Sequence, residues 1–260
     1  MARTLALVWS KYIDNLCYSS ANIDWNIDSE RSSLFGGFMI SQKISKISAV
    51  IEETAASCGR NIAEIKLIGV TKTKPIEMIR EAFEAGLMDV GENYVEDFSD
   101  KYQKYHPKGL NYHFIGRLPT KKVRKVVGKS QLIHSVGSIK LAKKIDFVAS
   151  EKNICQDILI QVNQGSESSK SGTDSDSLEN LVSEIIQLSN IRVCGLMSIP
   201  PFHEPARPYF SKLRNLRDTI QENLSIKLPY LSMGMSGDFV DAILEGSTHI
   251  RVGTLIFGQR

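Results

Sequence analysis

A lysine follows the first strongly apolar run of the chain. Residues 65–71 are rich in β-branched side chains and predict a buried strand, which Lys72 ends. Pro75 then suits the first turn of a helix. An amine at the C-terminal end of a buried strand can attack a carbonyl group when burial and neighbouring cations favour its neutral form. A solvated loop lysine is the alternative interpretation of Lys72 by itself.

Residues near the end of the chain could bind an anion. Ser236 precedes an expected helix over 237–244, where it would be the N-cap with free backbone N–H groups behind it. Arg251, Gly253 and Thr254 add a guanidinium, a position where backbone can approach a ligand closely, and a hydroxyl. These types predict a phosphate site, although a plain helix cap and a turn glycine would also explain them.

The lysine and the anion site together predict a pocket for a phosphorylated carbonyl compound. Pyridoxal 5′-phosphate (PLP) combines an aldehyde with a phosphate, so it is the cofactor we expect. A barrel that binds another sugar phosphate without PLP is an alternative.

The elements that must position these residues alternate along the chain. Eight short apolar runs predict strands, and amphipathic stretches follow the first seven. Such alternation indicates parallel βαβ units, and eight of them predict a closed (β/α)8 TIM-type barrel, with an open doubly wound sheet as the alternative. The expected strands are 65–71, 88–91, 111–115, 131–134, 157–162, 191–197, 229–232 and 248–252, and the helices are 75–85, 93–105, 119–127, 138–149, 174–189, 205–223 and 237–244.

The domain organisation is predicted as one barrel with an N-terminal extension. Apolar spacing over 40–58 predicts a lead helix that Gly59 stops, so we expect the barrel domain at 39–260. Residues 1–38 show no sustained period and are expected to be a poorly defined extension. Only its first dozen residues resemble a mitochondrial targeting segment, because acidic residues follow.

Composition excludes several other classes of protein. A net charge of +3 in 260 residues is too balanced to indicate nucleic-acid binding. The four cysteines have no paired metal-ligand spacing, and no apolar run is long enough to span a bilayer. We therefore expect a cytoplasmic protein without a metal, a nucleic-acid partner or a membrane partner.

Eight ordered motifs then identify a family. They are residues 69–75 (GVTKTKP), 91–95 (GENYV), 113–116 (HFIG), 133–136 (IHSV), 161–163 with 169–172 (QVN and SKSG), 195–199 (GLMSI), 233–236 (MGMS), and 246–248 with 251–254 and 256–258 (GST, RVGT and IFG). Over about residues 43–260 the chain closely resembles the pyridoxal phosphate homeostasis proteins, which are single-domain relatives of the alanine racemase barrel.

The resemblance implies roles for particular residues. Lys72 would form the Schiff base with PLP, and Arg251 would lie beside the cofactor. Phosphate-binding segments of the family match Ser236, Gly253 and Thr254. Pocket-lining positions match Asn93, His113 and Ser198.

The resemblance also implies a carrier that serves intracellular vitamin B6 homeostasis and delivers PLP, with PLP-dependent apo-enzymes as its clients, and we expect a monomer. No catalytic residue is expected, because racemases of this type need a further acid/base domain and the chain ends at Arg260. A PLP-dependent racemase or decarboxylase is the alternative. One motif departs from the family: Pro119 and Lys121 stand where a glutamine and an asparagine are usual.

Overall fold

The computed structural model describes residues 32–165, 172–201 and 203–259, and it describes side chains from Met39 onward. Residues 40–260 form one compact unit, and residues 1–39 form the other. Most of the expected extension 1–38 lies outside the described residues, so its predicted character stays a prediction.

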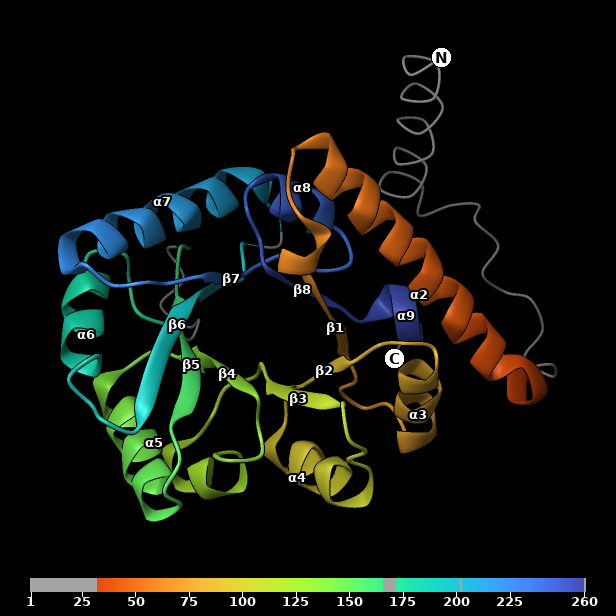
Figure 1. Cartoon of the computed structure of the whole chain (residues 1–260), viewed down its shortest axis with the longest axis horizontal. Helices are drawn as coiled ribbons and strands as arrows, with labels where there is room; N and C mark the ends of the chain where they lie inside the picture. The colour runs from red at the N-terminus through yellow and green to blue at the C-terminus, as the bar shows by residue number, and fades with distance from the viewer. Residues whose placement is uncertain (1–31, 166–171, 202, 260) are drawn as a thin grey trace. The chain divides into compact units, whose positions relative to one another are not determined.

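Eight parallel strands close into a barrel in sequence order (Figure 1), which confirms the predicted fold and rules out the open sheet. The strands are β1 (Lys66–Val70), β2 (Asp89–Glu92), β3 (Asn111–Phe114), β4 (Leu132–Val136), β5 (Gln156–Val162), β6 (Ile191–Ser198), β7 (Tyr230–Ser232) and β8 (His249–Val252). The barrel closes where β1 pairs with β8, with Ile68 opposite Arg251.

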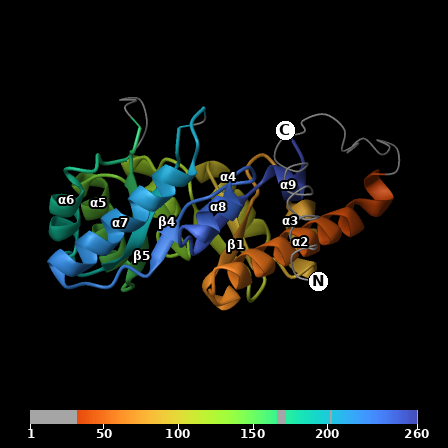
Figure 2. The same ribbon diagram turned by 90° about the horizontal axis from the view of Figure 1, so that it is seen from above.

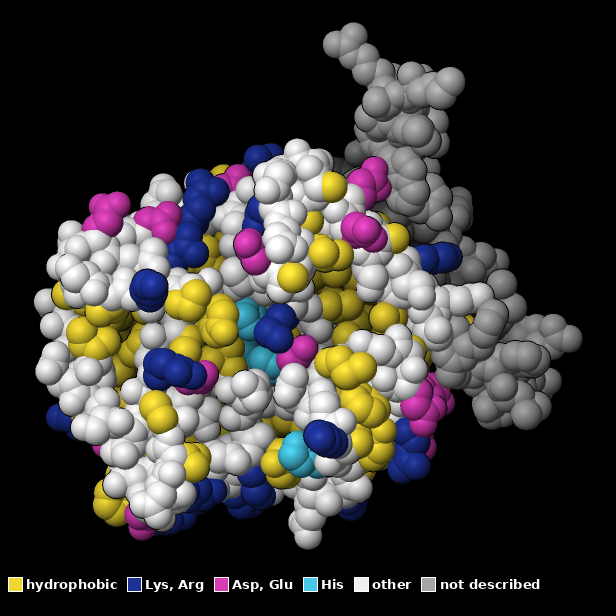
Figure 3. Space-filling view, viewed as in Figure 1, with side chains coloured by type: hydrophobic (Ala, Val, Ile, Leu, Met, Phe, Trp, Pro, Cys, Tyr) yellow, Lys and Arg dark blue, Asp and Glu magenta, His cyan; other side chains and the backbone are white. Residues whose placement is uncertain are grey.

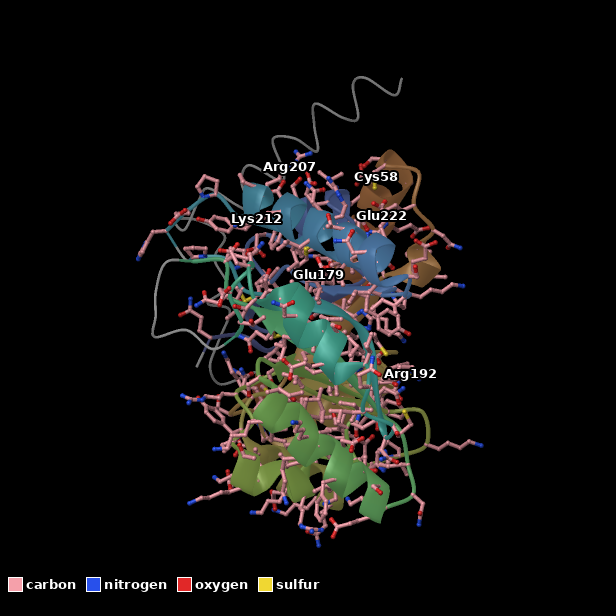
Figure 4. The ribbon with its side chains drawn as sticks, turned by 90° about the vertical axis from the view of Figure 1, so that its left-hand side faces the viewer. Cys58, Glu179, Arg192, Arg207, Lys212 and Glu222 are labelled. Atoms are coloured by element: carbon pink, nitrogen blue, oxygen red, sulfur yellow. The ribbon has the colours of Figure 1, made fainter. Side chains whose placement is uncertain are left out.

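Helices follow the strands and cover the outside of the barrel. They are α3 (Ile76–Glu84), α4 (Val95–Lys104), α5 (Ile139–Glu151), α6 (Leu178–Ile185), α7 (Arg207–Leu224), α8 (Phe239–Leu244) and α9 (Thr254–Phe257), and a short 3-10 helix, η1 (Ile62–Glu64), precedes β1. Two views turned by 90° place α5, α6 and α7 together on one flank (Figure 2). In Figure 4, Glu222 near the end of α7 and Arg192 near the start of β6 lie on the same, right-hand side, as expected for a helix antiparallel to its strand.

The lead helix α2 (Ser32–Ser57) begins earlier than the expected residue 40. Its buried side chains Ile40, Ile44, Ile47 and Ile51 recur at intervals of three and four residues, so they form one apolar stripe. This stripe belongs to the main hydrophobic core of the barrel unit, which lies between the sheet and its helices. The sequence pattern had predicted this packing face.

The stretch 119–127 is not the expected α-helix. Pro119 lies before a 3-10 helix, η2 (Thr120–Lys125), with three basic residues in its last turn. Buried Val123, Val126 and Val127 anchor it in the core. The apolar positions of this stretch therefore do form a packing face, but on a 3-10 helix and not on the expected α-helix. The departures at Pro119 and Lys121 fall in this turn.

The interior of the barrel is unusually polar. A small apolar cluster of Leu132, Leu159, Cys194 and Met197 fills part of it, with Tyr230 packed against the cluster. Beside this cluster the barrel holds the buried side chains of Asp89, His113, His134, Ser232, His249 and Arg251. Bulky branched residues usually dominate such interiors. Polar groups buried in this way are normally hydrogen-bonded.

Candidate functional site

Lys72 lies in a tight turn directly after β1. The N–H of Lys74 donates to the carbonyl of Thr71 over 3.0 Å, which closes the turn around Lys72 and Thr73. Thr73 has a φ of 61°, the left-handed conformation that the third residue of a type II turn adopts. Lys72 itself is half-buried. The turn therefore fixes the backbone of the lysine at the C-terminal mouth of the barrel.

A buried ion pair supports this turn from the neighbouring strand. Nζ of Lys101, on α4, lies 2.6 Å from Oε1 of Glu92 and 2.6 Å from the carbonyl oxygen of Thr71. The hydroxyl of Thr71 also donates to Oε1 of Glu92 over 2.6 Å. Burial raises the pKa of Glu92, and the charge of Lys101 opposes this rise. The residue before Lys72 is therefore held by side chains from two further elements.

The loops after β7 and β8 meet as the phosphate-site prediction requires. The hydroxyl of Ser236 accepts a hydrogen bond from the N–H of Gly253 over 3.4 Å. Gly253 is the N-cap residue of α9, and Thr254 is its first residue. The first N–H groups of a helix have no partner within the helix. The hydroxyls of Ser236 and Thr254 therefore lie beside the first N–H groups of α9.

Ser236 is not the N-cap of α8, contrary to our expectation. The chain already turns at Met235, whose carbonyl accepts from the N–H groups of Asp238 and Phe239. The carboxylate of Asp238 accepts in return from the N–H of Met235 over 2.5 Å, and Asp238 is the N-cap residue. Because the helix starts after Asp238, the hydroxyl of Ser236 does not cap it and instead faces the loop after β8.

Gly253 leaves space in front of its backbone. A Cβ atom placed on it would lie 3.4 Å from Cβ of Val70 and 3.5 Å from the carbonyl oxygen of Val70, at the edge of ordinary contact. Its φ of −114° is open to any residue, so no backbone strain demands a glycine here. A glycine at this position instead lets another group approach the N–H closely.

Arg251 is fixed inside the barrel, near the C-terminal ends of β6 and β7. Its guanidinium donates from Nη1 to the hydroxyl of Ser232 over 2.6 Å and from Nη2 to the carbonyl oxygen of Ser198 over 3.1 Å. Burial lowers the pKa of Arg251 to about 10, and the carboxylate of Asp238 opposes this effect. The guanidinium remains a cation at neutral pH and directs its donors to fixed acceptors.

Two further candidate residues carry buried polar atoms without a hydrogen-bond partner in the described structure. They are the hydroxyl of Ser198 and Oδ1 of Asn93. Asn93 also lines a cavity of about 290 Å³ at this end of the barrel, together with Gly116 and Asn163. A Cβ atom on Gly116 would lie 2.0 Å from the carbonyl oxygen of Asn93, so only glycine permits this approach of the two loops. An unpaired polar atom beside a cavity, such as Oδ1 of Asn93, is typical of a ligand site.

His113, which we expected to line the pocket, lies inside the barrel. Its Nε2 is 2.9 Å from Oδ1 of Asp89, and its Nδ1 is 3.0 Å from Nε2 of His134. Both ring nitrogens are therefore occupied by protein groups. Burial raises the pKa of Asp89, but the hydrogen bond from His113, with smaller contributions from Lys66 and Asn111, lowers it overall.

The structure thus brings most of the predicted site residues to the C-terminal end of the barrel. Sequence patterns missed Lys101, although its spacing from Val95 and Phe98 places it on the buried face of α4. Within the described residues no group of histidine, cysteine, aspartate and glutamate side chains could hold a metal ion. None of the helices in the same ranges combines the length and apolarity that a bilayer-spanning helix requires.

Comparisons with known proteins agree with this geometry. A family model described as "Alanine racemase, N-terminal domain" matches residues 54–260. The "Pyridoxal phosphate homeostasis protein" of Aquifex aeolicus is 45% identical over 222 residues, which cover 84% of this chain and 97% of the relative. The protein of the same name from Pseudomonas aeruginosa is 39% identical over 224 residues, 85% of this chain and 96% of the relative.

Among solved structures, PipY of Synechococcus elongatus PCC7942, described "with PLP bound", has a TM-score of 0.72 at 33% identity. The match covers 80% of this chain and all of that chain. The alanine racemase N-terminal fold is thus the class of the barrel unit. The chain belongs to the pyridoxal phosphate homeostasis protein family.

Proposed function

We propose that this chain binds PLP at the C-terminal face of its barrel and holds it as a Schiff base on Lys72. The observation that carries the proposal is the meeting of three features at one barrel end. They are the turn that fixes Lys72, the guanidinium of Arg251, and the contact of Ser236 with Gly253. The family relatives are named for PLP homeostasis, and the PipY structure is described as containing PLP.

The residues present suit the cofactor. PLP supplies an electrophilic aldehyde, a pyridine ring and a dianionic phosphate. In this proposal Ser236 and Thr254 donate to the phosphate beside the N–H of Gly253, because charge-assisted hydrogen bonds to an anion are strong. Arg251 lies beside the ring and keeps its orientation through its two fixed acceptors.

The remaining polar atoms line the same pocket in this proposal. The free hydroxyl of Ser198 and Oδ1 of Asn93 offer hydrogen bonds that no protein group uses in the described structure. Lys72 provides the amine, and the turn with Thr73 keeps it at the barrel mouth. The pocket therefore binds and orients the cofactor.

We further propose that the protein acts as a carrier, which buffers PLP in the cytoplasm and delivers it to PLP-dependent apo-enzymes without catalytic turnover. The names of the relatives support a homeostatic role. Free thiols at Cys58, Cys155 and Cys194 suit a reducing compartment. We expect a monomer, which light scattering coupled to gel filtration would test.

Reduction with borohydride tests the attachment. Protein loaded with PLP, reduced and digested should carry the added mass on the peptide that contains Lys72. Lys72→Ala should lose the label, whereas Lys74→Ala should keep it, because Nζ of Lys74 donates to the carbonyl of Gln259 instead. A label found mainly on Lys74 or Lys170 would overturn the assignment.

The carrier role has its own test. Loaded protein is mixed with single amino acids, and products are measured over many equivalents of PLP. We expect no more than one equivalent of any product. Multiple turnovers of racemised or decarboxylated amino acid would instead establish an enzyme of the racemase or decarboxylase type.

A further inference from the structure

A continuous row of hydrogen bonds crosses the interior of the barrel. It runs from Asp89 on β2 through His113 on β3 and His134 on β4 to Ser232 on β7, and ends at Arg251 on β8. The donor–acceptor distances are 2.9, 3.0, 2.8 and 2.6 Å in that order. Strands β4 and β7 are not neighbours, so the contact of His134 with Ser232 must pass through the barrel interior.

The groups at the two ends fix the direction in which protons are donated. A guanidinium can only donate, so Ser232 accepts from Arg251 and its own proton is left for Nδ1 of His134. An ionised carboxylate can only accept, so Nε2 of His113 carries a proton and donates it to Asp89.

The two histidines then have only one neutral arrangement. Nδ1 of His113 must accept, so Nε2 of His134 carries the proton that it receives. Nδ1 of His134 is free to accept from Ser232. A second proton on His113 would reverse this contact. Ser232 would then accept from both Arg251 and His134, and its own buried proton would lose its acceptor.

We propose that Ser232, His134, His113 and Asp89 are positioning residues that form one chain of hydrogen bonds, all donated toward Asp89, and that this chain holds Arg251 in place for the cofactor. The role of Arg251 toward the cofactor rests on the proposed function. The row of hydrogen bonds itself depends only on contacts among side chains that the barrel buries.

The far end of this chain reaches the opposite face of the barrel. Asp89 begins β2, accepts from Nδ2 of Asn111 over 3.1 Å, and lies 3.9 Å from the half-exposed ammonium of Lys66 at the start of β1. Figure 3 shows histidine side chains in the middle of this face, beside basic and acidic groups. A change made at this face should therefore be felt at Arg251 near the other end.

His249 provides a matched control within the same interior. It is as buried as the chain members, and its ring centroid lies 6.1 Å from that of His113 and 5.9 Å from that of His134. Its Nδ1, however, is 2.8 Å from the hydroxyl of Thr248, outside the chain. A substitution of His249 disturbs the packing without removing a link.

The first test reads the protons directly. Long-range ¹H–¹⁵N correlation spectra of full-length protein with ¹⁵N-labelled histidine, recorded at pH 7 without added PLP, should show His113 and His134 both neutral and protonated at Nε2. The Asp89→Leu variant should lose this preference at His113, whereas Asp89→Asn, which keeps an oxygen acceptor, should retain it. Protonation of either ring at Nδ1 in the wild type would overturn the chain.

The second test reads the effect on Arg251. PLP titrations should show about tenfold weaker binding for Asp89→Leu and Ser232→Ala, and a change of less than about twofold for Asp89→Asn and His249→Gln. Equal weakening by His249→Gln, or unchanged binding in a folded Asp89→Leu, would overturn the positioning role. If Asp89→Leu fails to fold, Ser232→Ala decides. A wild-type protein that does not bind PLP would refute the proposed function. The NMR spectra would still show whether the chain of hydrogen bonds exists.

Discussion

The ammonium of Lys101 and the carboxylate of Glu92 form a buried ion pair, 2.6 Å apart, directly beneath the turn that carries Lys72. Lys101 also donates to the carbonyl of Thr71, so one side chain ties α4, β2 and the end of β1 together. Removal of one partner from a buried pair leaves an uncompensated charge, which costs more than the pair itself contributes.

We therefore predict that Lys101→Met lowers the free energy of unfolding by about 3–5 kcal/mol, measured by urea denaturation. Lys101→Met combined with Glu92→Gln should recover much of the loss, because the amide stays neutral and can still accept from Thr71. Lys104→Met serves as the control, since its pair with Asp100 is more than half exposed and contributes little. Equal losses for Lys101→Met and Lys104→Met would contradict the prediction.

Single hydroxyl deletions should separate phosphate contacts from structural ones. Ser236→Ala and Thr254→Ala should each weaken PLP binding by roughly ten- to a hundredfold, since a hydrogen bond to a charged group contributes about 1.5–3 kcal/mol. Pyridoxal, which lacks the phosphate, should bind weakly and equally well to the wild type and both variants. If the substitutions weaken the binding of PLP and of pyridoxal equally, the hydroxyls only support the loops.

Gly253→Ala offers a sharper test of the same cradle. The added methyl group meets only ordinary contacts with Val70, so we expect the thermal unfolding midpoint to stay within a few degrees of the wild type. PLP affinity should nevertheless fall about tenfold or more, because the methyl group occupies the approach to the N–H. Unchanged affinity in a stable variant would place the phosphate elsewhere.

The buried histidines should make the fold sensitive to acid. Burial, with a smaller effect of the charge of Lys66, lowers the pKa of His249 to about 3, and burial also lowers the pKa of His134 well below its usual value. An unfolded histidine titrates near a pH of about 6.5, so below that pH the unfolded chain binds protons that the folded chain excludes.

Stability should therefore be complete above a pH of about 6.5 and fall as the pH decreases toward 3, by about 1.4 kcal/mol per pH unit for each such histidine. Urea unfolding in three buffers between roughly pH 6.5 and 4.5 measures this slope. His249→Gln should reduce it by one histidine's share. An identical slope in the variant would show that His249 is protonated in the folded protein.

Deletion of residues 1–38 should leave the barrel folded and able to bind PLP. The buried stripe of α2 begins at Ile40, so the truncated chain keeps every described core contact of that helix. Circular dichroism and a PLP titration, compared with the full chain, check this. An insoluble product, or a folded one that no longer binds PLP, would show that the barrel needs the extension.

Sequence patterns predicted the barrel well, because each strand is an apolar run bounded by turn residues and each helix has an apolar stripe. They also placed Lys72 and the segment from Arg251 to Thr254 at strand ends, where local order determines position. The position of His113 was harder to predict from the sequence, since its partners Asp89 and His134 come from two other strands. Lys101 was missed because a lysine on a helix is ordinarily solvated.

The prediction that Ser236 caps α8 was wrong for a related reason. Ser236 and Asp238 are both good candidates for a helix start, and the sequence does not say which one the chain selects. In the structure Asp238 is the N-cap residue, and its carboxylate accepts from the N–H of Met235 and not from an N–H of the helix. Such competition between neighbouring polar residues is settled by the geometry of the turn.

The seam between β1 and β8 has a consequence for synthesis. Lys72 follows the first strand of the barrel, whereas Gly253 and Thr254 follow the last, and these two strands pair directly. A chain emerging from the ribosome carries its lysine long before it has the other wall of the site. The proposed site therefore exists only in chains translated through β8. PLP would bind complete chains in preference to nascent ones.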